Sequence, residues 1–337
     1  MVLVSTGRSR ERVLVFGLEG VGKSLAALDI ASRVAPHKLY VIDNDNAWDR
    51  MLEGQTLAGE TVNVAEEYRW DAAVERKAGK DVGGWVFDGK WCVDGGNVVV
   101  FHADGWEANK AAIAAVREEA TGDDWCCIDS GSALWSDVQA WFTEQVFDQS
   151  MDDYFMQVRM EKAKAQADAK ALGALDGWVD WPVINAQYNG AVMKFLVNPP
   201  CHLIVTAEQA DVTSDQVDKE TRAMYGGEMV KPRGQKRIGH NVQTVLRMVK
   251  RGEDYKVTTV KDRGGRDKFK NDDVTDRGFA EWYLEEIAGW QEQTESTPTT
   301  PPTGSTTATG STPTSRHSGL VSKKPVAKTK TTIVKKG

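Results

Sequence analysis

Cysteines are few in this sequence, and long apolar runs are missing. The four cysteines, Cys92, Cys126, Cys127 and Cys201, have neither the C-x-x-C spacing of a metal site nor the density of a secreted disulfide scaffold. No run of 18 apolar residues occurs, and the first thirteen residues carry three arginines without the apolar stretch of a signal peptide. These absences argue against export and membrane insertion. We therefore expect a soluble, cytoplasmic protein with no membrane partner.

Negative charge dominates most of the chain. The 337 residues have a formal net charge of −7, but the part from Gln291 onward carries two acids and seven bases, which leaves −12 on residues 1–290. An acidic body of this kind repels phosphate at long range. Any nucleic acid must therefore bind through local basic patches or through the C-terminal segment.

Short apolar runs alternate with helical patterns between residues 12 and 260. This alternation is typical of βαβ units and predicts an α/β fold with a mainly parallel sheet flanked by helices. The predicted strands are Val13–Phe16, Leu39–Ile42, Val98–Phe101, Trp125–Ile128, Leu203–Val205, Val242–Met248 and Lys256–Val260.

Two stretches are predicted to be insertions in this core. The first, residues 60–96, contains Trp85–Val93, which has the pattern of a β-hairpin turning at Asp88 and Gly89. The second, residues 136–180, has a mostly helical pattern. With these insertions, residues 1–290 are predicted to form one domain.

The C-terminal segment differs from the rest in composition. Residues 294–315 are mainly Thr, Ser, Pro and Gly, with almost no apolar side chain, so they bury too little surface to offset chain entropy. We predict that residues 291–337 form a disordered linker ending in a basic terminus.

One run of eight residues indicates a phosphate-binding loop. It follows the predicted strand Val13–Phe16, precedes the apolar helix Ser24–Val34 and matches the pattern G-x-x-x-x-G-K-S. In such a loop, backbone amides and a helix N-terminus face the phosphates, the lysine reaches the β- and γ-phosphate oxygens, and the serine hydroxyl holds Mg²⁺. We predict ATP and Mg²⁺ as ligands, with a plain glycine-rich turn as the alternative. The loop residues are Gly17, Leu18, Glu19, Gly20, Val21, Gly22, Lys23 and Ser24.

Carboxylates follow two of the predicted strands. Trp-Cys-Cys-Ile-Asp129 is an apolar strand that ends in an aspartate, which is how P-loop ATPases deliver a carboxylate to the Mg²⁺ shell, although such an aspartate is also a common turn former. Ser130 stands where many motor ATPases have a glutamate that orients the attacking water. That function must come from elsewhere, and the strand after the loop's helix offers Asp43, Asp45 and Asp49.

The segment Ile42-Asp-Asn-Asp45-Asn-Ala-Trp-Asp49 resembles a segment of RecA-like recombinases, Ile-Asp-Ala-Glu-His-Ala-Leu-Asp, whose glutamate activates water. The resemblance assigns this role to Asp45. An aspartate is one methylene shorter than a glutamate, so it would hold the water farther away. Slow turnover is therefore expected.

Two further strands agree with this resemblance. His202-Leu-Ile-Val-Thr-Ala-Glu208-Gln209 resembles the strand whose terminal polar residue senses the γ-phosphate and leads into a DNA-binding loop. The segment Tyr255–Arg263 resembles the strand whose two cations, here Lys261 and Arg263, reach into the neighbouring subunit's active site. A cation supplied in trans would make hydrolysis depend on assembly. The alternative is an ordinary solvated strand end.

The resemblance is to phage-encoded RecA-like ATPases of the single-strand annealing type, AAA-ATPases with a RecA core. It spans roughly residues 12–285, and only the phosphate-binding loop is highly specific. The family also has a basic segment before the strand of Gln243. Here that segment could contact single-stranded DNA, with Tyr225 available for stacking, although charge runs are more often solvated faces. Its basic residues are Lys231, Arg233, Lys236 and Arg237.

The resemblance implies a DNA-dependent ATPase that assembles on single-stranded DNA, as a ring or filament, and promotes annealing or strand exchange. A ring helicase or packaging motor on the same core is one alternative, and a small-molecule kinase is another. A single-strand-binding protein is a candidate partner of the tail. If the protein is phage-encoded, it would act in the cytoplasm of a bacterial host.

Overall fold

The structure is a computed structural model that describes most of residues 10–292. The described residues are 3–4, 10–34, 37–48, 56–57, 60–61, 64–73, 76–77, 80–81, 83–89, 98–165, 175, 179–212, 219–226, 228–263 and 271–292. The predictions for Asp49, for residues 90–97 and for the tail beyond residue 292 lie outside them.

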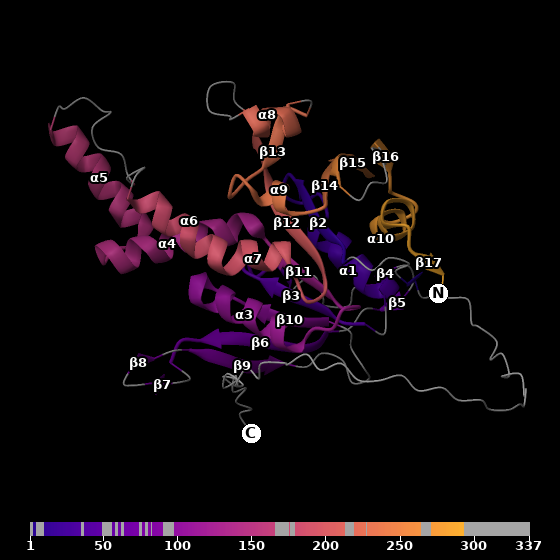
Figure 1. Ribbon diagram of the computed structural model, residues 1–337, viewed down its shortest axis with the longest axis horizontal. Helices are drawn as coiled ribbons and strands as arrows, with labels where there is room; N and C mark the ends of the chain where they lie inside the picture. The colour runs from indigo at the N-terminus through magenta and orange to yellow at the C-terminus, as the bar shows by residue number, and fades with distance from the viewer. Residues whose placement is uncertain are drawn as a thin grey trace, which may run out of the picture.

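The centre of the molecule is an 11-stranded sheet in which seven adjacent strands run parallel (Figure 1). The strand order is β16-β15-β14-β2-β12-β11-β3-β10-β6-β9, with β13 paired to β12. The outer strands β15, β16 and β9 are antiparallel to their neighbours. The predicted α/β fold with a mainly parallel sheet is confirmed. The parallel strands are β14 (Thr244–Arg251), β2 (Arg12–Gly17), β12 (His202–Asp211), β11 (Trp125–Asp129), β3 (Leu39–Asp43), β10 (Val98–His102) and β6 (Val64–Asp71), and the other strands of this sheet are β15 (Asp254–Asp262), β16 (Asn271–Asp273), β9 (Gly84–Gly89) and β13 (Val230–Pro232).

Helices cover both faces of this sheet, which is why its central strands are apolar throughout. In β2, for example, Leu14 and Phe16 belong to one buried cluster, whereas Val13 and Val15 belong to another on the opposite face. Burial on both faces removes the alternation of polar and apolar residues that a half-exposed strand would have. One face is covered by α1 (Lys23–Val34), α10 (Phe279–Glu281) and η2 (Trp282–Ala288), and the other by α3 (Gly105–Glu119), α4 (Gly131–Phe147), α6 (Asp180–Tyr188), η1 (Asn189–Met193) and α7 (Lys194–Val197).

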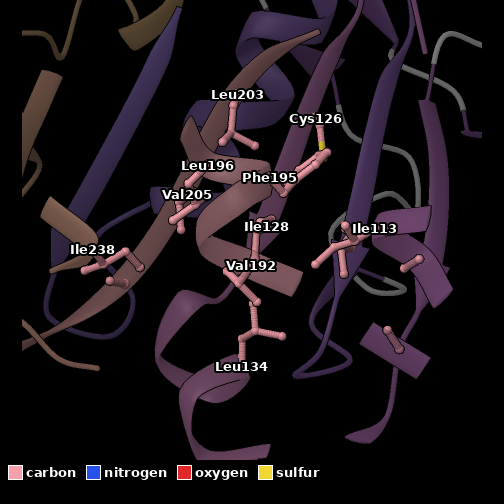
Figure 2. Close-up of a cluster of buried hydrophobic side chains, with 14 of the residues drawn as sticks. Ile113, Cys126, Ile128, Leu134, Val192, Phe195, Leu196, Leu203, Val205 and Ile238 are labelled. Carbon is pink, nitrogen blue, oxygen red and sulfur yellow. The ribbon is translucent and has the colours of Figure 1, made fainter. Parts of the chain in front are cut away.

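The buried side chains between the sheet and the helices α3, α4, α6, η1 and α7 form one continuous core. Figure 2 shows Phe195 and Leu196 of α7 together with Cys126 and Ile128 of β11. All four side chains are fully buried. The helix α5 (Met151–Ala165) follows α4 and projects away from the body (Figure 1). The ring of Tyr154 on α5 stacks on that of Phe147 on α4, with 4.3 Å between the ring centroids.

Beyond the sheet, β12 continues into a two-stranded extension with β13. The short helix α8 (Lys219–Tyr225) lies at the end of this extension, and α9 (Ile238–Asn241) leads into β14 (Figure 1). The remaining strands form small pairs, β1 (Leu3–Val4) with β17 (Gln291–Glu292), β4 (Thr56–Leu57) with β5 (Glu60–Thr61), and β7 (Arg76–Lys77) with β8 (Lys80–Asp81).

The predicted hairpin turn at Asp88 and Gly89 is wrong. Both residues belong to β9, which pairs antiparallel with the preceding strand β6 and extends the main sheet. Trp85 of β9 is 1% exposed, and its ring lies 5.2 Å from that of Trp70 on β6. Burial of Trp85 against the partly buried Trp70 at the edge of the sheet outweighs the local preference of an Asp-Gly pair for a turn. Within the described residues, no helix has the length and hydrophobicity needed to cross a membrane.

Candidate nucleotide-binding site

The loop between β2 and α1 has a backbone that only glycine readily adopts. Gly20 and Gly22 have φ values of +73° and +90°, in the left-handed region. At Gly17, an added Cβ would lie 2.3 Å from the carbonyl oxygen of Met248, so a side chain is excluded there by its neighbour on β14. The helix α1 begins at Lys23, immediately after the loop. Its first backbone amides therefore face the space that the loop surrounds.

Lys23 lies among carboxylates from several strand ends. Its Nζ donates hydrogen bonds to the carbonyl oxygens of Leu18, at 2.8 Å, and Gly17, at 3.3 Å. Burial lowers the pKa of Lys23, and four carboxylates act in the opposite direction. In order of their effect these are Asp129, Glu208, Asp45 and Glu19. The lysine is thus placed to exchange its carbonyl partners for phosphate oxygens.

Asp129 ends β11 and is 2% exposed. Its carboxylate accepts hydrogen bonds from the indole nitrogen of Trp48, at 2.8 Å to Oδ2, and from the hydroxyl of Thr206 to Oδ1. A carboxylate has about four lone-pair sites, so two remain for water or metal. These partners fix the orientation of Asp129. This donor set fits Mg²⁺, which usually keeps several waters and takes one or two carboxylates together with substrate phosphates. Ser24 would supply the hydroxyl ligand.

The loop after β3 is attached to the end of β11 at two points. One is the bond from Trp48 to Asp129. The other is Asn44, whose side-chain oxygen accepts from the backbone nitrogen of Ser130 at 2.5 Å and whose nitrogen donates to the Ser130 oxygen at 3.0 Å. The backbone nitrogen of Asn44 also donates to the Asp129 oxygen at 2.9 Å. Asp45 lies between the two attachment points, so its position relative to Asp129 is fixed.

Asp45 is exposed but has a perturbed carboxyl group. Partial burial of the carboxyl, together with the negative charges of Asp129 and Asp43, raises the pKa of Asp45 to about 7. A carboxyl with this pKa is suited to general base catalysis near neutral pH. Asp43 itself is buried and bonded to His102 Nδ1 at 3.0 Å, so it has a structural partner and does not face solvent.

Glu208 and Gln209 lie where β12 passes the phosphate-binding loop. Glu208 is in register with Gly17 of β2, and its carboxylate pairs with Arg233 at 2.7 Å. The Gln209 side chain accepts a hydrogen bond from Arg247 Nε at 3.4 Å. Both residues therefore lie at the same end of the parallel strands as Lys23 and Asp129. Their role in sensing the γ-phosphate remains a prediction.

Lys261 and Arg263 lie at the opposite end of the parallel strands from Lys23 and Asp129. Lys261 is paired with Val245 near the start of β14, and it is 8% exposed. Its Nζ donates to the carbonyl oxygens of Gly239, His240 and Val242 at 2.6, 3.2 and 2.7 Å. Burial, followed by the charges of Arg263 and Arg12, lowers the pKa of Lys261 to about 8. Lys261 is thus engaged within its own chain, whereas Arg263 is exposed and donates to the His240 oxygen at 3.0 Å.

A cavity of about 440 Å³ lies beside the start of α1. Its volume is within the range of small-ligand sites. Tyr255 of β15 forms one wall and lies 3.4 Å from a Cβ built on Gly22, and Lys250 lies 4.9 Å from the centroid of the Tyr255 ring. Apolar lining residues come from α1, β14, the segment before α10 and α10 itself, and they are Leu25, Ala26, Met248, Val274 and Phe279. Charged side chains also line the cavity, namely Asp29, Arg33, Asp276, Arg277 and Glu281.

The basic segment 231–237 lies on and after β13, next to the extension of β12. Arg233, Lys236 and Arg237 are exposed, and Lys231 is half-buried. The predicted stacking role of Tyr225 is wrong, because this side chain is 3% exposed and its ring packs edge-on against Phe16, 6.1 Å away. A tyrosine within a core cannot stack on a base without unfolding that core.

Comparison with solved structures finds a number of chains of similar fold, and two of them show how low the similarity is. The RadB recombinase shares 11% identity at a TM-score of 0.35, over 76% of this chain and 84% of its own. The second solved structure, an ATPase domain, shares 9% identity at a TM-score of 0.39, over 80% of this chain and 83% of its own. No family model and no curated protein matches the sequence. At this level of structural similarity, function must be inferred from the residues of the site.

Several residues of the site were not predicted from the sequence. Thr206 is a polar residue within an otherwise apolar strand, which is a weak signal for a functional side chain. Trp48 and Asn44 lie in the Asp- and Asn-rich loop, but nothing local indicates that they bond to β11. No sequence pattern indicated Tyr255 or the cavity beside α1, because the cavity forms only when β15 and α10 pack beside the loop.

Proposed function

We propose that this chain is a RecA-like P-loop ATPase that binds ATP with Mg²⁺ and hydrolyses it. The observation that carries the proposal is the gathering of three carboxylates around Lys23 of a glycine-rich loop: Asp129 at the end of β11, Asp45 in the loop after β3, and Glu208 on β12. The carboxyl ends of parallel strands meet at one edge of the sheet, which is where α/β proteins bind ligands. The positive φ values of the loop fit a backbone curled around phosphate.

Each residue has a distinct role in this proposal. The loop amides and Lys23 bind the phosphates. Ser24 and Asp129 would hold Mg²⁺, which would neutralise charge on the phosphates. Asp45 orients the attacking water and accepts its proton, for which a pKa of about 7 is suited. Glu208 and Gln209 sense the γ-phosphate in this proposal, which is supported by their place beside the loop. The cavity beside Tyr255 would hold the base of the nucleotide.

We further propose that the protein acts in DNA metabolism, assembling on single-stranded DNA as a ring or filament and promoting annealing or strand exchange. The exposed cations of the segment 231–237 support DNA contact, and the exposed Arg263 supports a contribution to a neighbouring subunit. Tail contact with a single-strand-binding protein belongs to this proposal as well. The sequence resemblance to RecA-like annealing ATPases supports the same function.

The test is ATP hydrolysis by the full chain with Mg²⁺, measured with no DNA, with single-stranded DNA and with duplex DNA. We expect hydrolysis that single-stranded DNA stimulates. Lys23→Ala should abolish it, because the lysine supplies the charge that binds the phosphates. Hydrolysis that survives in Lys23→Ala would contradict the assignment of the loop. Hydrolysis that DNA leaves unchanged, with no DNA retained at low salt, would contradict the nucleic-acid part alone. Duplex unwinding would favour a helicase.

A further inference from the structure

A second, larger cavity lies at the amino ends of the parallel strands, opposite the phosphate-binding loop. It has a volume of about 960 Å³ and is open to solvent. It forms where the residues before β2, the end of α3, the helix α7 and the helix α9 come together, whereas the phosphate-binding loop follows the other end of β2. The two cavities are therefore separate sites.

The charge of this cavity is of one sign. Its cations are Arg10, Arg117, Lys194 and Arg237, and no carboxylate is among its lining residues. This is unexpected because residues 1–290 carry a formal net charge of −12, and cations in an acidic protein usually lie close to carboxylates. Such a concentration of positive charge favours a bound polyanion.

The arginines near this cavity are held by the protein. Arg10 Nη1 donates to the Pro199 oxygen at 2.7 Å, and the guanidinium of Arg117 lies over the ring of Phe195 at 5.5 Å. Arg12 lies beside the cavity and donates to the Val197 oxygen at 2.5 Å. Each guanidinium has five N–H donors, so these contacts leave donors free for phosphate. Burial and the charge of Arg263 lower the pKa of Arg12, as expected where cations gather without carboxylates.

We propose that this cavity, the basic groove, binds the phosphate backbone of single-stranded nucleic acid. Apolar side chains also line the groove and can support sugars and bases, and lining amides can contact them. Arg237 belongs both to the groove and to the basic segment 231–237, so a strand could continue from one to the other. No aromatic side chain lines the groove, so binding should follow the backbone without base preference. The apolar lining residues are Met193, Val197, Pro199 and Pro200, and the amides are those of Asn189, Asn198 and Asn241.

This inference rests on the nucleic-acid part of the proposed function but not on ATP hydrolysis. The test compares the full chain with Arg117→Gln/Lys194→Gln, which removes two exposed groove cations and keeps a polar side chain at each position. The matched control is Arg159→Gln/Arg251→Gln, which removes two exposed cations from α5 and from the end of β14. Binding of labelled oligo-dT and oligo-dA is measured by fluorescence anisotropy over a series of salt concentrations. Thermal melting establishes that all variants are folded.

For single strands, the logarithm of affinity falls with the logarithm of salt concentration by about 0.7 per phosphate contact. We therefore expect the groove variant to have a slope shallower by about 1.4 and an affinity lower by about tenfold at low salt, equally for both oligonucleotides. The control should match the unmodified chain. Equal losses in the groove variant and the control would reduce the effect to net charge and overturn the proposal.

Three other outcomes would also overturn it. Binding of inorganic pyrophosphate that the groove variant loses, without oligonucleotide binding by the unmodified chain, would make the groove a site for a small phosphate compound. A change in sedimentation alone would make it an interface between copies of this chain. Unchanged oligonucleotide binding in the groove variant would remove the groove from the DNA path. ATP hydrolysis in the same preparations separates these results from failure of the ATPase assignment.

Discussion

At the scale of single residues, the site depends on hydrogen bonds that orient charged groups. Asp129 and Asp45 are both carboxylates on neighbouring strand ends, but their surroundings differ. Asp129 is buried and has two donors, whereas Asp45 is exposed beside two other negative charges and has a raised pKa. Under the proposed mechanism, these different environments suit chemically identical groups to different roles, one as a metal ligand and one as a base.

The first prediction concerns the pH dependence of hydrolysis. Only the ionised form of Asp45 can accept a proton, and its pKa is about 7, so kcat/KM should rise with pH and level off above neutrality. Asp45→Asn should lower kcat at least about 100-fold and remove this rise. Asp45→Glu is the matched control, because it keeps the carboxylate. A pH profile that is the same in Asp45→Asn would exclude Asp45 as the base.

The second prediction concerns Trp48, a positioning residue. Trp48→Phe keeps an aromatic ring but removes the N–H that bonds to Asp129, so the carboxylate becomes less well oriented for Mg²⁺. The Mg²⁺ concentration for half-maximal hydrolysis should rise about tenfold, as is typical when an outer partner of a metal ligand is lost. Trp125→Phe is the control, because Trp125 is also fully buried but its indole nitrogen has no bond to another described residue. Equal effects of both substitutions would indicate packing alone.

At the scale of secondary-structure elements, most of the site is built from strand ends, and their order in the sheet determines which groups meet. The strand β12 lies between β2 and β11, which places Thr206 against Asp129 and Glu208 beside Gly17. The antiparallel strand β15 has the opposite direction. Its beginning therefore supplies Tyr255 to the cavity beside α1, and its end carries Lys261 at the far edge.

The third prediction concerns the segment between α9 and β14. Lys261 binds three backbone carbonyls there, so Lys261→Met should leave buried acceptors without a donor and lower the free energy of unfolding by about 1–3 kcal/mol. Denaturant unfolding measures this loss. Arg263→Met, which removes a more exposed cation from the same strand end, should change stability much less. If Lys261→Met is as stable as the unmodified chain, the three bonds contribute little.

At the scale of the whole molecule, the distribution of charge gives the protein two different ends. Carboxylates and the phosphate-binding loop lie at one edge of the sheet, whereas Arg10, Arg12, Arg237 and Arg263 lie at the other. Head-to-tail association that leaves the basic groove open would bring Arg263 of one copy to the phosphates held by the next. The exposed Arg263 is better placed for this than the buried Lys261.

The fourth prediction tests this arrangement by mixing inactive variants. Lys23→Ala lacks a working loop but keeps Arg263, and Arg263→Ala has an intact loop but lacks the cation. Each alone should hydrolyse ATP poorly, and their mixture should recover part of the activity at interfaces that combine the two intact parts. A mixture of Lys23→Ala with the unmodified chain serves as the reference. A mixture no more active than the two variants separately would mean that Arg263 does not act across an interface.

The sequence by itself determined the elements that depend on local pattern. The parallel sheet followed from apolar runs such as Val13–Phe16 and Trp125–Ile128, because strands buried on both faces need apolar residues throughout. The loop from Gly17 to Ser24 was recognisable because its glycines and lysine are adjacent in the chain. The sequence pattern wrongly predicted a turn at Asp88 and Gly89, because pairing of β9 with β6 and burial of Trp85 outweighed the local turn preference.

Only the tertiary structure decided which distant side chains meet. Trp48 and Asp129 are 81 positions apart, and Tyr255 lies beside a loop more than 200 positions earlier, so no local spacing could join them. The same holds for Tyr225 and Lys261, whose residue types suggest contact with DNA or phosphate but whose burial gives them partners within the chain. Local sequence fixes backbone preference and polarity, whereas the packing of the sheet and helices fixes whether a polar group faces a ligand or its own fold.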